Sequence, residues 1–163
     1  MNTNSNYENT QIIHFEKDNE EHRQAFLNLN TEWLEKYFYV EELDREILSN
    51  PEKNVINTGG SILFAKFNNE IIGTGSLIKA ADGIFELSKL SITEKYKGFG
   101  TGKKLVLALI ELAKEKGIKK LYLVSSRKLI PAITLYKKFG FIESEENRHS
   151  CFERGNITME LTL

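Results

Sequence analysis

The chain has 163 residues, of which 40% are hydrophobic and 28% are charged, so its size and composition are those of one globular domain. No apolar stretch approaches the roughly 18 residues that a membrane span requires, and the polar start lacks the apolar segment of a signal peptide. A single cysteine excludes an internal disulfide, and three scattered histidines do not indicate a metal site. We therefore expect a cytoplasmic protein that binds neither a membrane nor a metal ion.

The net charge of -1 conceals two oppositely charged halves. Residues 95–140 contain 12 Lys/Arg and 2 Asp/Glu, a net charge of +10, whereas the rest of the chain carries -11. Residues 1–60 alone contain 5 Lys/Arg against 12 Asp/Glu. This asymmetry favours a polyanionic ligand for the basic half. Solvated faces of lysine-rich helices are the alternative explanation.

The predicted elements form one domain over residues 11–163, preceded by a flexible N-terminal tail over residues 1–10. Asp18 is the predicted cap of the first helix, and Asn68-Asn69 is a predicted hairpin turn. We expect, in chain order, strand 11–15, helices 18–37 and 41–49, strands 61–67, 71–79 and 84–92, helix 100–116, strand 119–124, helix 131–139, and strands 141–145 and 151–161. The order β-α-α-β-β-β-α-β-α-β-β mixes a meander with a βαβ crossover. It predicts the class α/β (α+β), with a mixed, mostly antiparallel sheet of six or seven strands.

The most informative stretch is Lys95-Tyr-Lys-Gly-Phe-Gly-Thr-Gly-Lys103, between a predicted strand and a predicted helix. Gly98, Gly100 and Gly102 allow the backbone to curl without a Cβ atom in the way, so amide hydrogens converge at the positive end of a helix. This arrangement indicates a socket for phosphate or pyrophosphate. Its spacing fits neither a Walker A loop nor a Rossmann fingerprint. A plain glycine-rich turn is the alternative.

These residues resemble the phosphate loop of the GNAT superfamily of N-acetyltransferases, Q/R-x-x-G-x-G/A, which joins the fourth strand to the third helix. Lys95-x-x-Gly98-x-Gly100 is similar to it, with Lys in place of Gln or Arg. Residues 132–141 (AITLYKKFGF) are similar to the family's A-x-x-L-Y-x-x-x-G-F signature. Residues 152–159 (FERGNITM) resemble the closing strand of a bacterial subgroup that also carries a strand like residues 86–90 (ELSKL).

The resemblance implies an acyltransferase that moves an acetyl group from acetyl-CoA to a primary amine by direct attack. In this family the pantetheine arm pairs with the fourth strand and the pyrophosphate lies in the glycine-rich loop. The implied coenzyme-binding residues are Leu90, Ser91, Ile92, Lys97, Gly98, Phe99, Gly100, Thr101, Gly102, Lys103 and Ser126.

Two residues are candidates for proton transfer. Tyr136 is the expected general acid for the departing sulfur, because the pKa of a phenol, about 10, exceeds that of a thiol, about 8.5. Glu86 is the first candidate base, because alternation places it on one strand face with Ser88 and Leu90. A backbone N–H near Leu90 would face the oxyanion. The alternatives are a core aromatic for Tyr136 and a merely paired or rim carboxylate for Glu86.

The expected acceptor is a small-molecule or peptide amine. Glu41 and Glu42 lie between two predicted helices where the family forms its acceptor site, and Trp33 lies on the neighbouring apolar stripe. The two carboxylates would attract a cationic amine or simply solvate a helix start, and Trp33 fits a core as well as a pocket. A weakly catalytic acyl-CoA-binding sensor or interaction module is the alternative function. Nucleic-acid binding is not expected, since a basic platform lined by aromatics is missing. Dimers are frequent among proteins that this chain resembles, so a homodimer is one expectation.

Overall fold

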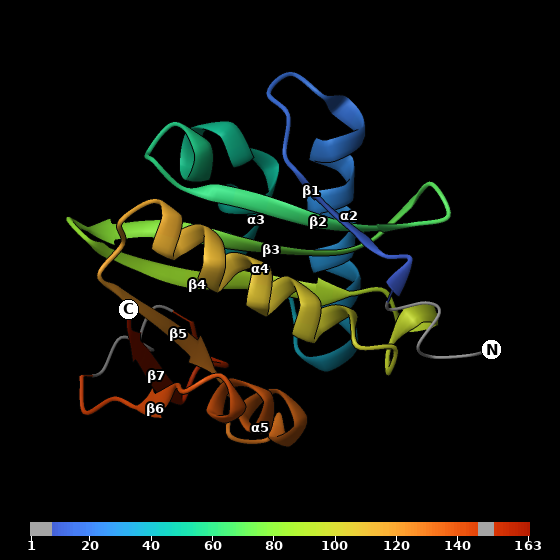
Figure 1. Ribbon diagram of the computed structural model, residues 1–163. Coiled ribbons are helices and arrows are strands. Elements are labelled where there is room, and N and C mark those ends of the chain that lie inside the picture. The colour runs from blue at the N-terminus through green and yellow to red at the C-terminus, as the bar shows by residue number, and fades with distance from the viewer. Residues whose placement is uncertain (1–7, 147–151) are drawn as a thin grey trace.

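The computed structural model describes residues 8–146 and 152–163, and it consists of one sheet with helices on both faces (Figure 1). The strands are β1 (Gln11–His14), β2 (Ser61–Phe67), β3 (Glu70–Ala81), β4 (Ile84–Ile92), β5 (Lys120–Ser125), β6 (Ile142–Glu143) and β7 (Ile157–Thr162). The helices are α2 (Glu20–Tyr37), α3 (Glu42–Ser49), α4 (Thr101–Glu115) and α5 (Ile130–Lys138), with a π-helical segment η1 (Glu52–Ile56) and a 3-10 turn η2 (Glu94–Tyr96). Among the residues described, no helix has the length and apolar character needed to cross a bilayer.

The strands lie in the order β1-β2-β3-β4-β5-β7-β6. All neighbouring pairs are antiparallel except β4 and β5, which run parallel. This pair is parallel because the chain crosses from β4 to β5 through α4 and so enters both strands from the same end of the sheet. The predicted class and element order are confirmed.

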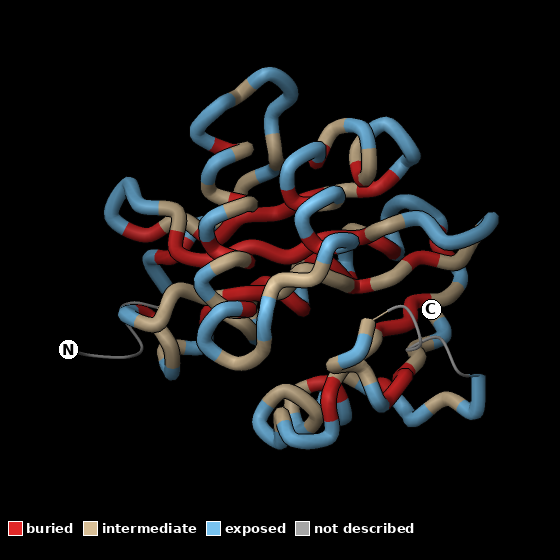
Figure 2. The backbone as a smooth tube through the Cα atoms, turned by 180° about the vertical axis from the view of Figure 1, so that it is seen from behind, coloured by how far each residue is buried: buried red, intermediate tan, exposed pale blue. Residues whose placement is uncertain are grey.

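A hydrophobic core lies on each face of the sheet. α4 buries Leu105 and Leu109 on one face, together with residues of β3, β4 and β5. α2 and α3 cover the other face with Phe26 and Leu48, which pack on β2. The view from behind shows long buried stretches along the central strands (Figure 2). Because both faces are covered, burial does not alternate along the central strands: residues 62–65 of β2 form a buried apolar run, and residues 72–77 of β3, which include Thr74 and Ser76, are all buried.

Local capping and turn chemistry set the ends of these elements. Asn19 caps α2, and its side-chain oxygen accepts a hydrogen bond from the backbone N–H of His22 at 3.0 Å. The predicted cap at Asp18 is wrong, since Asp18 has a φ of 62° and precedes the cap. The predicted hairpin is present, with φ of 49° at Asn68 and 61° at Asn69, because Asn tolerates the left-handed region.

Three other features differ from the predictions. β7 begins at Ile157 instead of residue 151, because residues 152–156 are irregular and carry the side chain of Arg154 inward. The π-helical segment η1 has no counterpart among the predicted elements. Thr10 is 4% exposed, and its carbonyl accepts a hydrogen bond from Lys104, which corrects the end of the predicted tail. Residues 1–7 of that tail and Cys151 lie outside the described residues.

β4 and β5 pair only at their beginnings. The paired residues are Ile84–Glu86 of β4 with Lys120–Tyr122 of β5, although both strands continue further. The two strands therefore diverge, and the second half of β4 has no strand partner on that edge among the described residues. An opening in the sheet results.

A β-bulge in β4 lies at the edge of this opening. Lys89 and Leu90 both stand opposite Gly75, and Lys89 has a φ of 55°. The bulge shifts the alternation of side chains, so Leu90 packs with the core beneath α4. Glu86 alternates with Phe85 and Leu87 of that core and points to the other face. The prediction that Glu86 and Leu90 share a face is therefore wrong.

Candidate active site

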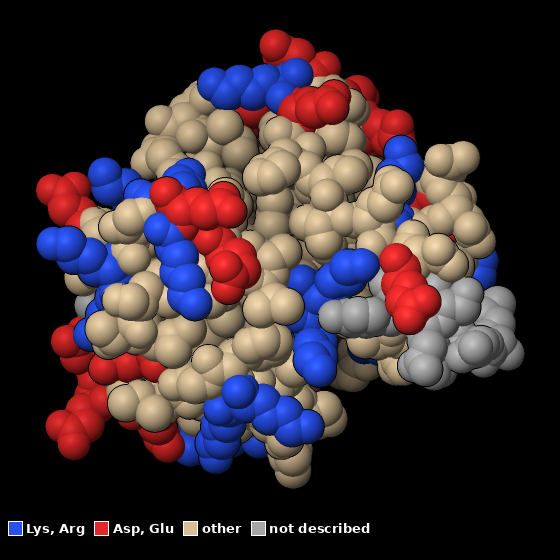
Figure 3. Space-filling model, in the orientation of Figure 1, with Lys and Arg blue, Asp and Glu red and all other residues tan. Residues whose placement is uncertain are grey.

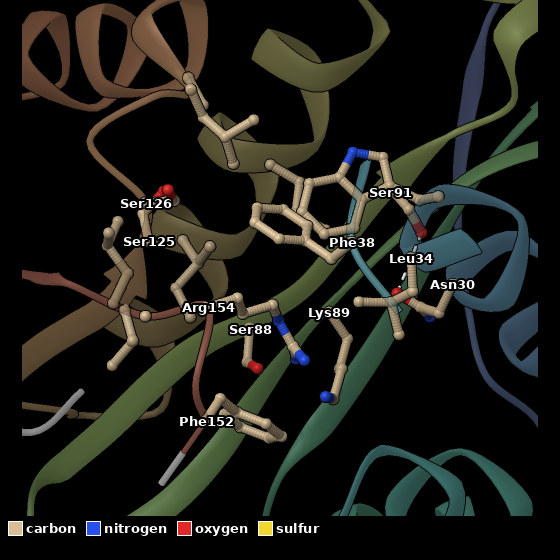
Figure 4. A pocket seen from close by; sticks show the side chains of 18 of the residues that line it. Asn30, Leu34, Phe38, Ser88, Lys89, Ser91, Ser125, Ser126, Phe152 and Arg154 are labelled. Atoms are coloured by element: carbon tan, nitrogen blue, oxygen red, sulfur yellow. Dashed lines mark hydrogen bonds between the residues drawn. The ribbon is translucent and has the colours of Figure 1, made fainter. Parts of the chain in front are cut away.

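A cavity of about 220 Å³ fills the opening between β4 and β5 (Figure 4). Its walls come from the two strands, the last turns of α2, the start of α5 and residues 152–155. The residues predicted from the sequence that line it are Trp33, Glu86, Leu90, Ser91, Ile92, Lys97, Ser126 and Tyr136. The structure therefore brings both proton-transfer candidates together with the predicted pantetheine strand.

The glycine-rich loop leads from η2 into α4. Gly98 and Gly100 have φ of 83° and 81°, conformations that favour glycine, whereas Gly102 lies within the first turn of the helix. α4 begins after Gly100 without a side-chain cap and without an acidic residue in its first turn. Its first N–H groups and positive dipole end are therefore suited to an anion. Lys and Arg side chains gather near the start of α4 and over α5 on the same face (Figure 3).

The other loop residues that were predicted to bind the coenzyme differ in burial and in the groups they contact. Phe99 packs edge-on to Tyr96, with ring centroids 6.3 Å apart, and Thr101 is buried, so both anchor the loop. Lys103 is exposed on the first turn of α4. Lys97 reaches the cavity, but its ammonium pairs with Glu94 at 2.6 Å and bonds to the Tyr37 hydroxyl. A phosphate would have to compete with Glu94 for Lys97.

Tyr136 enters the cavity from α5. Its ring packs edge-on to Phe141, with centroids 6.0 Å apart. Burial raises the pKa of Tyr136 to about 12, so the phenol keeps its proton at neutral pH. A protonated hydroxyl beside the cavity is able to act as a general acid.

Glu86 lies on the cavity wall at the point where β4 and β5 separate. Burial raises the pKa of its carboxyl, and the charge of Lys89 offsets part of that effect. The Tyr122 hydroxyl of β5 lies 3.4 Å from Oε2. A carboxyl with a raised pKa is a stronger base than an ordinary exposed one, which suits proton removal from an amine.

The predicted acceptor carboxylates do not reach the cavity. Neither Glu41 nor Glu42 is among the described residues that line it. Glu41 instead pairs with Arg154 at 2.9 Å, and Glu42 is exposed on the first turn of α3. Trp33 does line the cavity and packs against Phe38, with ring centroids 5.5 Å apart.

Sequence reasoning missed a buried ion cluster at one end of the cavity. The Asp44 carboxylate pairs with Lys89 at 2.8 Å and with Arg154 at 2.7 Å. Both cations line the cavity and lie over the ring of Phe152, at 4.8 and 4.1 Å from its centroid (Figure 4). The resemblance of residues 86–90 and 152–159 marked two of these segments. No sequence signal connected Asp44 to either.

A second missed contact ties α2 to β4 beside the bulge. The Ser91 hydroxyl donates to Oδ1 of Asn30 at 3.0 Å, and Nδ2 of Asn30 donates to the carbonyl of Phe26 at 2.8 Å. Ser91 and Asn30 are buried and line the cavity (Figure 4). This pair anchors the second half of β4 to α2 in the region where β4 and β5 diverge.

Comparison with known proteins identifies the family. A model of the acetyltransferase (GNAT) family matches residues 19–141, which is most of the chain. The chain belongs to the GNAT family. It is 34% identical over 86 residues to the uncharacterized N-acetyltransferase YjgM of Escherichia coli, a match that covers 51% of this chain and 52% of that protein. It is 45% identical over 56 residues to the spermine/spermidine N(1)-acetyltransferase of Bacillus subtilis, covering 34% of this chain and 37% of the other.

The match to YobR, an uncharacterized N-acetyltransferase of Bacillus subtilis, has 27% identity over 86 residues and covers 53% of this chain and 35% of the other. The chain thus spans about a third to two thirds of the length of the first curated relatives that it matches.

Solved GNAT structures share the whole fold. An acetyltransferase from Staphylococcus aureus Mu50 superposes with a TM-score of 0.82 at 25% identity, covering 94% of this chain and 99% of the other. The PaiA N-acetyltransferase of Thermoplasma acidophilum, solved with coenzyme A, gives a TM-score of 0.71 at 22% identity, covering 94% and 99%. The predicted family and fold are confirmed.

Proposed function

We propose that the chain is an acetyl-CoA-dependent N-acetyltransferase that transfers acetyl to a primary amine by direct attack. The observation that carries this proposal is the diverging β4–β5 pair, which opens a cavity lined by Glu86, by Tyr136 and, from the loop that leads into α4, by Lys97. Membership of the GNAT family supports the same activity.

The chain's own residues fit the coenzyme. The loop around Gly98 has open space where a side chain would otherwise stand, with nothing within 4 Å of a Cβ placed there. The unpaired edge of β4 offers the backbone of Leu90, Ser91 and Ile92 to the pantetheine arm, and Ser126 stands across the cavity on the β5 side. When bound, acetyl-CoA supplies an activated thioester; the protein supplies donors, orientation and proton transfer.

The proton-transfer roles follow from burial. Glu86, whose pKa is raised, accepts a proton from the incoming ammonium, which makes the amine a nucleophile. The Tyr136 hydroxyl is protonated throughout the neutral range and is the donor for the leaving thiolate. Burial raises the pKa of both groups, but a carboxyl with a raised pKa remains far more acidic than a phenol with a pKa of about 12. They therefore divide the base and acid tasks between them.

The acceptor is a small-molecule or peptide amine narrow enough for a cavity walled by Trp33, Phe38 and Phe152. The spermine/spermidine acetyltransferase among the relatives places polyamines in the set of amines to be tested. The location of the chain in the cytoplasm remains part of the proposal.

The test is an acceptor screen with the purified full chain. Free thiol released from acetyl-CoA is followed with polyamines, amino acids, an aminoglycoside and a short peptide, while calorimetry measures coenzyme A binding. We expect heat on coenzyme binding and amine-dependent thiol release. Binding without turnover on any amine would favour the acyl-CoA sensor instead, and the absence of binding would overturn both.

A further inference from the structure

The carboxylate of Asp44 is the most highly connected charged group around the cavity. Its side chain is fully buried, at 0% exposure. Oδ1 accepts from Nζ of Lys89 at 2.8 Å and from Nη2 of Arg154 at 2.7 Å. Oδ2 accepts from Nη1 of Arg154 at 2.8 Å and from the backbone N–H of Glu41 at 3.0 Å. Buried carboxylates are retained only with such compensation.

These bonds join three segments that are far apart in the sequence. Asp44 belongs to α3, Lys89 to the bulge of β4, and Arg154 to the irregular segment before β7. Lys89 and Arg154 line the cavity, with side chains 6% and 14% exposed, whereas Asp44 is not among its lining residues. Asp44 thus stands behind the cavity wall and cannot touch a substrate. Its influence must act through the two cations.

The electrostatic surroundings of Glu86 make that influence important. Lys89 of β4 and Arg154 both act on the Glu86 carboxyl, and Tyr122 of β5 contacts it. On β3 it faces the uncharged Ile78. The other charged or titratable groups on the cavity wall, Lys97 and Tyr136, belong to η2's end and to α5.

Asp44 and Glu41 together balance the two cations that act on Glu86. Without Asp44, Lys89 and Arg154 would face Glu86 with only the charge of Glu41 to offset them. An excess of positive charge stabilises the carboxylate form of Glu86 and weakens it as a base.

We propose that Asp44 is a positioning residue for acetyl transfer: it balances the charges of Lys89 and Arg154 so that Glu86 keeps its basicity, and it holds three segments of the cavity wall together. The inference rests on the proposed function, because it assigns Glu86 the task of removing the proton from the acceptor amine.

The sign of each substitution follows from this balance. Asp44→Asn removes a negative charge, so the pKa of Glu86 falls and the acid limb of the kcat/KM profile moves to lower pH. Lys89→Met removes a positive charge, so the same limb moves to higher pH. The double variant removes one charge of each sign and returns the limb toward that of the unsubstituted protein. Each single shift is expected to be about one pH unit.

The experiment measures kcat/KM against pH for the full chain with the best amine of the screen. Glu86→Gln identifies the acid limb, which it should abolish. Glu46→Gln serves as the matched control, since Glu46 is exposed on the same helix and pairs only at 3.7 Å with Lys53; its profile should be unchanged. Calorimetry with coenzyme A verifies that each variant retains a folded coenzyme site.

Opposite shifts of the two single variants support the inference. If wild-type turnover is normal while both variants keep the wild-type limb, the inference is overturned and the proposed function survives. Shifts in the same direction also overturn it, because they indicate structural damage instead of charge balance. Should Asp44→Asn fail to fold, Lys89→Met alone decides: an upward shift supports the inference and an unchanged or downward limb overturns it. The absence of turnover in the unsubstituted chain would instead refute the proposed function.

Discussion

At the residue scale, burial is the main determinant of the chemistry around the cavity. It raises the pKa of both Tyr136 and Glu86, and it lowers the pKa of Lys89 despite the neighbouring Asp44. Burial also acts to raise the pKa of Asp44, but the hydrogen bonds from Arg154 and the charge of Lys89 outweigh it, so that the pKa lies below its ordinary value. Asp44 therefore remains ionised, and it stays an effective counter-ion throughout the neutral range.

Replacement of Tyr136 by Phe tests the acid role directly. The substitution keeps the ring that packs on Phe141 and removes only the hydroxyl. We expect kcat to fall by about a hundredfold or more, the usual contribution of a general acid, while coenzyme A affinity changes less than about twofold. Steady-state kinetics and calorimetry measure the two quantities. A variant as active as the parent would leave Tyr136 as a core aromatic.

At the element scale, the start of α4 combines a fold requirement with the binding role that we propose for it. Gly98 and Gly100 need positive φ for the turn itself. Gly102 does not, because it is helical and a Cβ there would meet only Cγ1 of Ile92 at 3.9 Å, an ordinary contact. A Cβ in a helix tilts toward its N-terminus, so an added methyl group at Gly102 would project toward the anion site.

Alanine at Gly102 should therefore separate stability from binding. We expect Gly102→Ala to raise the free energy of unfolding by about 0.5–1 kcal/mol, through the better helix propensity of Ala, and to weaken coenzyme A binding about tenfold. Gly117→Ala is the matched variant, since Gly117 follows the other end of α4 with a φ of 73°. It should lose about 1 kcal/mol of stability and bind normally. Denaturant titration and calorimetry check both; equal affinities in the two variants would contradict the loop's role.

Glu94 of η2 pairs with Lys36 of α2 and with Lys97, and we expect the stability that these pairs contribute to be lost in acid. Hydrogen bonds from Lys36 and Lys97 lower the pKa of Glu94 to about 2 from an ordinary value of 4.5. A lowered pKa means that the ionised group stabilises the fold above pH about 4.5 and that this contribution is lost as the pH falls toward 2. Glu94→Gln should therefore be less stable than the parent at pH 7, with the difference closing toward pH 2.

Urea titrations between these pH values measure that difference. Because Glu94 and its two lysine partners are partly exposed to solvent, added salt should reduce the stability difference between Glu94→Gln and the parent at pH 7. Lys36→Gln removes one donor and should reproduce part of the effect. A difference between Glu94→Gln and the parent that is the same at pH 2 and pH 7 would contradict the assignment.

Features that depend on residues close together in the sequence could be predicted, whereas features that depend on residues far apart in the sequence could not. Helix periodicity, the Asn68-Asn69 turn and the glycine-rich loop depend on neighbouring residues, so the element order and the conformation of that loop were predictable. The bulge at Lys89 and the inward course of Arg154 depend on Asp44, 45 residues before Lys89 and 110 before Arg154. No local pattern encodes such contacts. The pairing of the Glu41 carboxylate, a candidate for the acceptor site by resemblance to the family, with Arg154 is another such contact.

At the scale of the whole molecule, the basic and acidic halves of the chain form different parts of the structure. The basic half supplies the glycine-rich loop, α4, β5 and α5; of these, β5, α5 and Lys97 of the loop line the cavity. The acidic N-terminal part supplies α2 and α3 on the other face of the sheet. Several carboxylates of that part are paired internally, as Glu41, Asp44 and Glu52 are, so they are less available to recruit a cationic acceptor than their number indicates.

The basic half should make coenzyme binding depend on salt and on the 3′-phosphate. Exposed charges interact over a Debye length of about 10 Å at 0.1 M salt and about 3 Å at 1 M. We expect the Kd for coenzyme A to rise about tenfold between low and high salt, and that for dephospho-coenzyme A to rise less, because it carries fewer charges. An oligonucleotide should not displace coenzyme A, since the loop donors match a compact diphosphate. Calorimetry across a salt series measures all three. If the two coenzymes respond identically, the lysines around α4 and α5 do not contact the 3′-phosphate, and the amides of the glycine loop account for anion binding alone.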